Sequence, residues 1–285
     1  MFSARLKRRS LVWWGKPNKW RNRESYRHLL HRLKENYTLR SRDDPEARWH
    51  CCDLWQRTLS NKWNAREFVQ RHGVRVPDLY WHGHRVGGLR LDALPEHFVL
   101  RPVVGDSRRG VYVFAGDTEL LREKRYTKAG LMSELQRTRG RLSRFPLLVE
   151  EFVQTERGEY QLPVEYKCHT FGETIGAIEV IKRVNDSTAM FGFYSPEWKR
   201  FEDKMNAKCV LAYEADPPQC LDEILANARR LGVLYGTYVR IDLYATNRGC
   251  VFGEFSTTPD AGRGFTPFAE QYFEDLWRAT FPDRT

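Results

Sequence analysis

The sequence contains no apolar run long enough to cross a membrane. A transmembrane helix needs about 18 or more consecutive apolar residues, and no such stretch occurs among the 285 residues. The first residues are basic, but their apolar part is too short for a signal peptide, and no small-residue cleavage site follows it. We therefore expect a cytoplasmic protein without a transmembrane segment.

Sequence signatures of zinc binding and of covalent catalysis are also missing. The six cysteines show no CxxC spacing, since Cys51 and Cys52 are adjacent and the others are scattered. This pattern argues against a zinc site and fits reduced thiols in the cytoplasm. The chain has no GKS or GKT motif of a P-loop, and no Ser-His-Asp or Cys-His set stands out. Internal repeats and low-complexity segments are absent as well.

Positive charge, by contrast, is abundant. The chain carries 47 Lys and Arg against 37 Asp and Glu, for a net charge of +10. Such an excess suggests an anionic partner: a nucleotide, an acidic polymer, nucleic acid or a membrane surface. Much of it lies in residues 1–45, interleaved with tryptophans, but Leu29, Leu30 and Leu33 recur there at helical spacing and favour a packed helix. Peripheral membrane contact through this basic N-terminal region stays an alternative, and nucleic-acid binding is not expected.

Two helices are predicted to frame the strands described below. The first covers residues 64–72, with Asn61 as N-cap and Gly73 just after its last turn. The second starts at Leu221, has one apolar face and is predicted to end at Gly232. Neither helix carries chemistry by itself.

Near the C-terminus, two segments alternate between apolar and polar residues, as strands do. In residues 238–244, apolar side chains alternate with Arg240 and Asp242, so that one face is apolar and the other carries chemistry. Residues 252–256 alternate in the same way. A three-residue hairpin loop at 247–249 would end on a glycine, which tolerates positive φ.

That loop sets Asp242 directly opposite Glu254, and Arg240 opposite Ser256. Two carboxylates directly opposite each other destabilise a sheet, so a buried pair needs a positive group between them. A hard cation such as Mg²⁺, which takes one or two carboxylates plus substrate phosphates, fits best. Arg240 would then neutralise charge on a transferring phosphoryl group. Taken alone, the segment is more commonly an exposed sheet with one charged face.

Three upstream segments add candidate binding groups. A strand, a glycine-containing turn and a second strand are predicted over 96–114, and such a unit folds over phosphates, with Ser107 as donor and Arg101 as the charge. Residues 147–153 form a strand ending in two acids, beside which an adenine ring would find free backbone groups. Lys167 and Arg183 would face a phosphate. The ordinary alternatives are a hairpin with a basic tip, a solvated strand end and surface cations.

The order of these pieces is more specific than any one of them. It resembles the ATP-grasp superfamily, most closely the branch named after teichuronopeptide biosynthesis, the TupA-like ATP-grasp proteins. The match spans roughly residues 60 to 265, and its last two segments are the most specific. The segments that carry it are NKWNAREFVQRHG (61–73), FVLRPVVGDSRRGVYV (98–113), LLVEEFV (147–153), VEYKCHTFGE (164–173), FYSPEW (193–198), VRIDLY (239–244) and FGEFSTTP (252–259).

The resemblance implies an α+β protein with the ATP-grasp fold, in which two α+β subdomains grip ATP. It places a basic N-terminal region at 1–95, a lid subdomain at 96–149 and a C-terminal subdomain with the metal site at 150–285. The implied activity is that of an ATP-dependent carboxylate–amine ligase that forms an amide through an acyl phosphate, with ATP and Mg²⁺ as cofactors. The implied substrates are carboxylates and amines, either small peptide- or amino-acid-like molecules or precursors of a cell-surface polymer.

Site residues follow from their positions in the matched segments. Arg101 stands where lysine is usual and keeps the charge for bidentate phosphate binding. Ser256 stands where asparagine is commoner as the third metal ligand, and Arg108 and Arg109 stand where glycines are common. The resemblance implies Asp242, Glu254 and Ser256 as metal ligands, Arg240, Lys167 and Arg183 as catalytic cations, and Arg101, Ser107, Gly110, Glu150, Glu151, Phe152 and Val153 as nucleotide-binding residues.

Two other functions stay open at this point. The first is a kinase of the same fold that phosphorylates a sugar or a carboxylate without ligation. The second is a non-catalytic protein that binds an anionic polymer, which the net charge of +10 would suit. The pair Asp242 and Glu254 disfavours the second, because a binding module has little use for two opposed acids.

Overall fold

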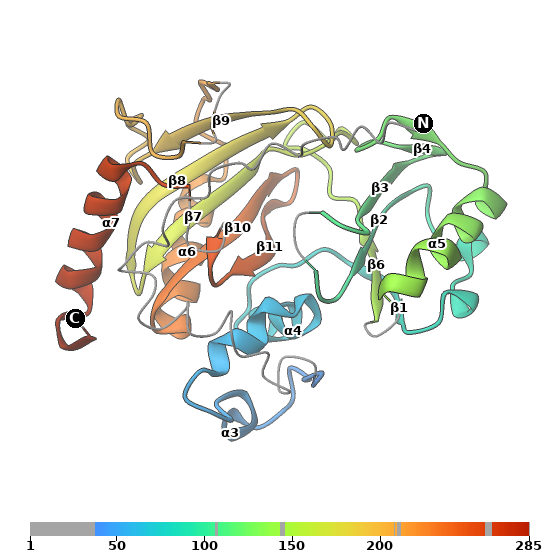
Figure 1. The fold of residues 1–285 in the computed structure, drawn as a ribbon, viewed down its shortest axis with the longest axis horizontal. Coiled ribbons are helices and arrows are strands. Elements are labelled where there is room, and N and C mark those ends of the chain that lie inside the picture. The colour runs from blue at the N-terminus through green and yellow to red at the C-terminus, as the bar shows by residue number, and fades with distance from the viewer. Residues whose placement is uncertain are drawn as a thin grey trace, which may run out of the picture.

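A computed structural model of the chain describes residues 38–105, 108–142, 146–207, 209, 212–259 and 264–284. The basic segment at residues 1–37, with the helix expected there, lies outside the described residues, as does Ser107. Within the described ranges, none of the helices is both long and apolar enough to span a bilayer. The described chain forms two antiparallel sheets with helices packed against them (Figure 1).

The N-terminal part of the described chain is helical. Helix α3 (Glu46–Trp49) and a 3₁₀ helix (Trp55–Ser60) precede α4 (Lys62–Arg71). The side chain of Asn61 accepts hydrogen bonds from the backbone N–H groups of Trp63 and Asn64, which confirms the predicted N-cap. Gly73 follows the helix with φ of 71°, as expected for a C-terminal glycine. The cap fixes where α4 starts, and with it the position of Lys62.

The first sheet has the strand order β1-β6-β2-β3-β4-β5, and α5 (Lys128–Leu142) packs on it through Leu131 and Leu135. Its first strand pairs with β6 and precedes residue 96, and β6 ends at Glu151, so the sheet extends beyond the predicted lid at both ends. The strands are β1 (Leu79–Gly83), β2 (His97–Pro102), β3 (Tyr112–Ala115), β4 (Thr118–Glu119), β5 (Lys124–Arg125) and β6 (Leu147–Glu151).

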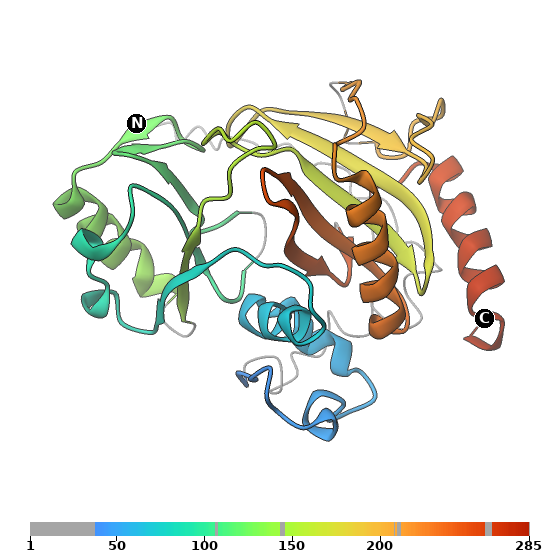
Figure 2. The ribbon, with the colours of Figure 1, turned by 180° about the vertical axis from the view of Figure 1, so that it is seen from behind.

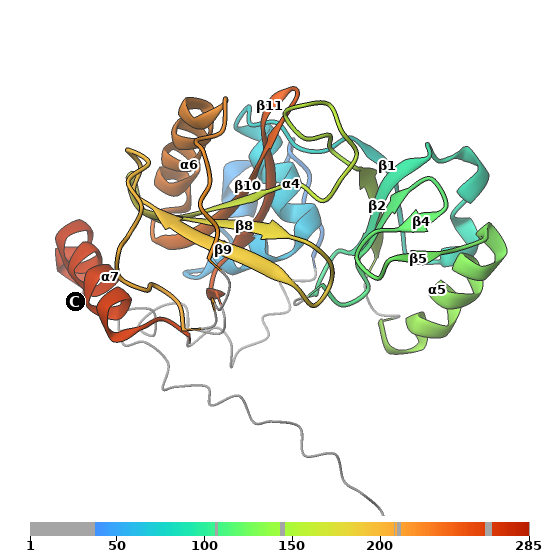
Figure 3. The same ribbon diagram turned by 90° about the horizontal axis from the view of Figure 1, so that it is seen from above.

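The second sheet has the order β11-β10-β7-β8-β9. One face packs on α6 (Leu221–Tyr235), and Figure 2 shows this helix lying across the sheet. Helix α7 (Pro267–Thr280) packs against one end of the opposite face through Phe273 and Trp277. The strands are β7 (Glu165–Phe171), β8 (Thr174–Arg183), β9 (Ala189–Tyr194), β10 (Tyr238–Thr246) and β11 (Gly249–Ser256). Seen from above, the two sheets lie side by side, and α4 overlaps the part of the second sheet nearer to the first (Figure 3).

Helix α6 does not end at Gly232, where we predicted its end. It continues to Tyr235, and Gly236 takes the left-handed conformation with φ of 75°. Gly232 serves close packing instead, because a Cβ atom there would lie 2.2 Å from the carbonyl oxygen of Gly172. A glycine that ends a helix and one that admits a neighbouring strand look alike in sequence.

The β10–β11 hairpin has the predicted register but not the predicted loop. Thr246 pairs with Gly249, so the loop has two residues, and Gly249 itself has φ of 85°. A β-bulge between Asp242 and Leu243 then adds Gly253 to β11. The extra residue compensates for the shorter loop, and Asp242 still lies opposite Glu254, as Arg240 lies opposite Ser256.

The bulge also decides which side chains of β11 are buried. The sequence pattern placed residue 252 on the same face as Glu254, but Phe252 pairs with Leu243 and packs with it in the core. Gly253 has no room for a side chain, because a Cβ atom there would lie 2.9 Å from the ring of Tyr244 and 3.0 Å from the carbonyl oxygen of Asp242. The polar face of the hairpin therefore begins at Glu254.

Candidate functional site

Asp242, near the centre of the second sheet, is held by two cations. Its register partner on β7 is Lys167, whose ammonium group bonds to Oδ2. Arg240 Nε lies 2.8 Å from Oδ1, and Arg240 Nη2 lies 2.9 Å from Oδ2. Protein side chains thus supply the positive charge beside Asp242 for which the sequence suggested a metal ion.

Lys167 is shared between Asp242 and Glu165, two positions before it on β7. Its Nζ lies 2.6 Å from Glu165 Oε2, and Arg183 Nε lies 3.2 Å from Glu165 Oε1. Burial lowers the pKa of Lys167, but Asp242 and Glu165 outweigh it, so the net shift is upward and the ammonium form is retained. Burial raises the pKa of Glu165, but Lys167 and Arg183 reverse this and the net shift is downward. The shifts of Lys167 and Glu165 thus both favour the charged forms, which bond to each other.

Arg240 connects Asp242 to two further residues. Its Nη2 donates to Ser256 Oγ at 3.0 Å, and its Nη1 lies 3.9 Å from Glu179 Oε2 on β8. Burial opposes its charge, but Asp242 raises the pKa of Arg240 above the ordinary arginine value. The structure thus brings Arg240, Asp242 and Ser256 together as predicted and gives the Ser256 hydroxyl a hydrogen bond to arginine. The metal-ligand role of Ser256 stays a prediction.

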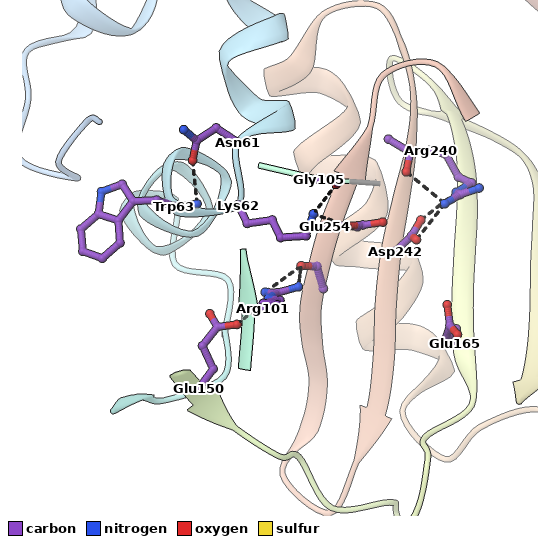
Figure 4. A network of polar contacts seen from close by, with 12 residues as sticks. Asn61, Lys62, Trp63, Arg101, Gly105, Glu150, Glu165, Arg240, Asp242 and Glu254 are labelled. Carbon is purple, nitrogen blue, oxygen red and sulfur yellow. Dashed lines mark hydrogen bonds and ion pairs between the residues drawn. The ribbon is translucent and has the colours of Figure 1, made fainter. Parts of the chain in front are cut away.

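Glu254 faces a cation that the sequence analysis did not select. Lys62 Nζ, from the first residue of α4, lies 3.3 Å from Glu254 Oε2 and donates to the carbonyl oxygen of Gly105 at 3.1 Å (Figure 4). The backbone N–H of Lys62 also donates to Val103 at 2.8 Å. Burial raises the pKa of Glu254, but Lys62 and the other cations bring it below its ordinary value. The available signal was local, because Lys62 directly follows the predicted N-cap and projects from the start of a helix.

Arg101 on β2 is anchored by Glu150 on β6. Arg101 Nε lies 2.7 Å from Glu150 Oε2, while Arg66 Nη1 of α4 lies 3.2 Å from Glu150 Oε1. The two terminal nitrogens of Arg101 lie 3.5 Å from the carbonyl oxygen of Gly253, which connects the first sheet to the bulge of β11. Arg101, predicted to bind phosphate, thus faces the hairpin that carries the predicted metal ligands Asp242 and Glu254.

The remaining predicted nucleotide-binding residues lie in different environments. Phe152 is buried in a small cluster with Val113 and Leu121, and Val153 is buried. Glu151 Oε2 accepts from the backbone N–H of Asp78 at 3.0 Å and pairs with Arg248. Gly110 has φ of 74°, in the turn that contains the undescribed Ser107.

The arrangement suits a nucleotide-bound metal better than a protein-only metal site. Among the described residues, no three or more His, Cys, Asp or Glu side chains form a group that could hold a metal ion. Asp242 and Glu254 nevertheless pair directly across neighbouring strands. Mg²⁺ takes one or two carboxylates and completes its shell with phosphates and water, so these two residues fit it if phosphates are present.

Comparison with known families identifies the fold. The profile of the TupA-like ATPgrasp family matches residues 49–279. The chain belongs to the TupA-like ATP-grasp family. This family assignment and the two-sheet α+β architecture confirm the resemblance and the fold class expected from the sequence. A comparison with curated protein sequences finds no match.

Solved structures resemble this ATP-grasp protein at low sequence identity. D-alanine–D-alanine ligase from Bacillus anthracis complexed with ATP aligns with a TM-score of 0.52 and 16% identity, over 81% of this chain and 69% of that chain. A second structure of the same ligase gives a TM-score of 0.52 and 16% identity, over 81% of this chain and 70% of that chain. The ATP-grasp ligase PsnB with minimal precursor, Mg and ADP gives 0.46 and 14% identity, over 81% and 60%. At these identities the likeness concerns the fold.

Proposed function

We propose that this TupA-like ATP-grasp protein is an ATP-dependent ligase that joins a carboxylate to an amine through an acyl phosphate. One observation carries the proposal: four cations surround two paired carboxylates where the two sheets meet, and a fifth cation joins them through Glu165. Phosphoryl transfer depends on positioning and charge stabilisation more than on a protein nucleophile. The four cations around Asp242 and Glu254 are Lys62, Arg101, Lys167 and Arg240, and the fifth is Arg183, which pairs with Glu165.

Arg101 and Lys62 are the proposed phosphate ligands. Arg101 keeps Nε on Glu150 at 2.7 Å, while its two terminal nitrogens reach Gly253 only at 3.5 Å. A guanidinium anchored in this way offers two N–H groups to a phosphate in a bidentate geometry. Lys62 adds a charge beside Gly105, at the start of the turn predicted to cover phosphates. We assign the adenine base to the backbone of residues 150–153.

Arg240 is the proposed stabiliser of the transferring phosphoryl group. Asp242 and Ser256 orient its guanidinium through the contacts described above, which lowers the entropy lost on binding. Mg²⁺, held by Glu254 with Asp242 opposite, would neutralise phosphate charge when bound. Lys167 and Arg183 both pair with Glu165 and add two positive charges to this face of the sheet. The proposed compartment is the cytoplasm, and the proposed substrates are a peptide- or amino-acid-like acid and amine or a polymer precursor.

Nucleotide binding is tested by thermal shift with a non-hydrolysable ATP analogue and Mg²⁺. Ligand at 100 times its Kd should stabilise the folded protein by about 2.7 kcal/mol. Losing one charge-assisted contact in Lys62→Met should remove about 1.5–3 kcal/mol of binding free energy. Glu254→Gln and, to a smaller extent, Asp242→Asn should weaken the part of the nucleotide binding that depends on Mg²⁺. Glu173→Gln, an exposed acid in the turn between β7 and β8, is the matched control.

The reaction is tested by measuring ADP with pools of acids and amines. ADP that appears only when both an acid and an amine are present supports the ligase. ADP that appears without an amine supports the kinase alternative. Wild-type protein that neither binds the analogue nor releases ADP would overturn both, and binding of an anionic polymer would then be the function to test.

A further inference from the structure

The two paired carboxylates of the hairpin differ in access. The side chain of Asp242 is 4% exposed, and both of its oxygens bond to Lys167 or Arg240. The side chain of Glu254 is 35% exposed, and its Oε2 lies 3.3 Å from the ammonium group of Lys62. A hydrated cation arriving from solvent therefore meets Glu254 first, and reaches Asp242 only by displacing a bonded cation.

Of the two cations bonded to Asp242, Lys167 is the one that the neighbouring strand holds directly opposite it. Its position is set by backbone pairing, because its register partners are Asp242 on β10 and Glu179 on β8. Its side chain is 7% exposed and bonds to Glu165 as well as Asp242. Removing one partner from a buried ion pair leaves an uncompensated charge and is strongly unfavourable. Lys167 thus holds a fixed positive charge where a second divalent cation would bind Asp242.

The formal charges of this face already cancel. Apart from Arg101, which bonds to Glu150, four cations (Lys62, Lys167, Arg183 and Arg240) lie beside four carboxylates (Glu165, Glu179, Asp242 and Glu254). Sites of phosphoryl transfer hold one or two divalent cations, and each added cation needs negative charge from carboxylates or phosphates. Here the protein offers one accessible carboxylate.

We propose that Lys167 is the built-in counter-ion of Asp242, and that the protein therefore takes a single divalent cation, anchored by Glu254. Lys167 is in this sense a specificity-determining residue for the metal content of the site. The part of the inference that involves nucleotide rests on the proposed function. The part that involves Glu254, Asp242 and Lys167 concerns these side chains alone.

The test counts bound Mn²⁺ by electron paramagnetic resonance, with the metal alone and with a non-hydrolysable ATP analogue. Wild-type protein should bind a single Mn²⁺ per chain. Glu254→Gln should weaken this binding about 100-fold, whereas Asp242→Asn should keep it within a few-fold. Lys167→Met should admit a second Mn²⁺, and Lys167→Arg, which keeps the charge, should not.

Three results would overturn the inference: two Mn²⁺ bound to the wild type, equal losses in Glu254→Gln and Asp242→Asn, or no Mn²⁺ in either arm. An unchanged count in a folded Lys167→Met protein would do so as well. If Lys167→Met does not fold, the comparison of Glu254→Gln with Asp242→Asn decides alone. Failure of the analogue to bind overturns the proposed function, while the ranking of the variants with Mn²⁺ alone still decides the inference.

Discussion

Ion pairs of nearly equal length occur in two very different regions of this protein. At the junction of the sheets, Arg101 Nε lies 2.7 Å from Glu150, whose side chain is 2% exposed. At the outer edge of the first sheet, Arg125 lies 2.5 Å from Asp117, with side chains 79% and 50% exposed. When an exposed ion pair breaks, water solvates both charges. When one partner of a buried pair is removed, the other charge stays in the interior without compensation. Distance does not distinguish the candidate site from the surface, but burial does.

The largest effect is expected from breaking the buried pair. Glu150→Gln leaves Arg66 and Arg101 without their common carboxylate. Removing one partner of a buried ion pair typically costs about 3–5 kcal/mol, so the free energy of unfolding should fall by that amount. Chemical denaturation of the wild type and of Glu150→Gln measures this difference in the free energy of unfolding. A loss no greater than that of Asp117→Asn at the exposed edge would erase the contrast between the regions.

A smaller effect is expected from Gly253→Ala, which tests the bulge that aligns the site. The new methyl group would lie 2.9 Å from the ring of Tyr244, so the strand or the ring must shift. Overpacking of this kind costs about 1–3 kcal/mol and should also weaken nucleotide binding. Gly87→Ala is the control, because no atom lies within 4 Å of its Cβ position. Equal stability of both variants would show that the bulge is dispensable.

The pH dependence of stability should also distinguish a paired carboxylate of the site, Glu165, from an exposed one, Glu173. The folded-state pKa of Glu165 is lowered, so its contribution is present above the ordinary value of 4.5 and is lost as the pH falls through the lower folded value. Glu165→Gln should therefore flatten the loss of stability in acid. Urea titrations below and above pH 4.5 measure this slope for the variant and for Glu173→Gln. An identical slope in both would mean that Lys167 and Arg183 do not stabilise the Glu165 carboxylate.

The smallest effect is expected for a second exposed ion pair, between the start of α5 and the segment before β2. Lys128 Nζ lies 2.5 Å from Asp92 Oδ1, but both side chains are largely in water. A double-mutant cycle with Lys128→Ala and Asp92→Ala should give no measurable coupling in the free energy of unfolding. A clear coupling here would show that the short distance, and not burial, sets the strength of ion pairs in this protein.

Some features of the site follow from short stretches of sequence. The Asn61 cap and the alternation along β10 are local, because a side chain that bonds to the backbone two or three residues away, or a strand with a two-residue period, needs no distant partner. The family resemblance rested on the order of such segments and was confirmed. The predicted end of α6 at Gly232 was wrong, since the packing of Gly232 against Gly172 involves another part of the chain.

The sequence alone determined that Arg240 and Asp242 share one face of a strand, and that Asn61 caps a helix. Only the tertiary structure decided that Lys167, which lies 75 residues from Asp242 in the sequence, supplies its counter-charge. Likewise, Lys62 meets Glu254 only because α4 packs beside β11. The physical reason is that periodicity and capping act over a few residues, whereas charge compensation in a buried site depends on which strands and helices become neighbours.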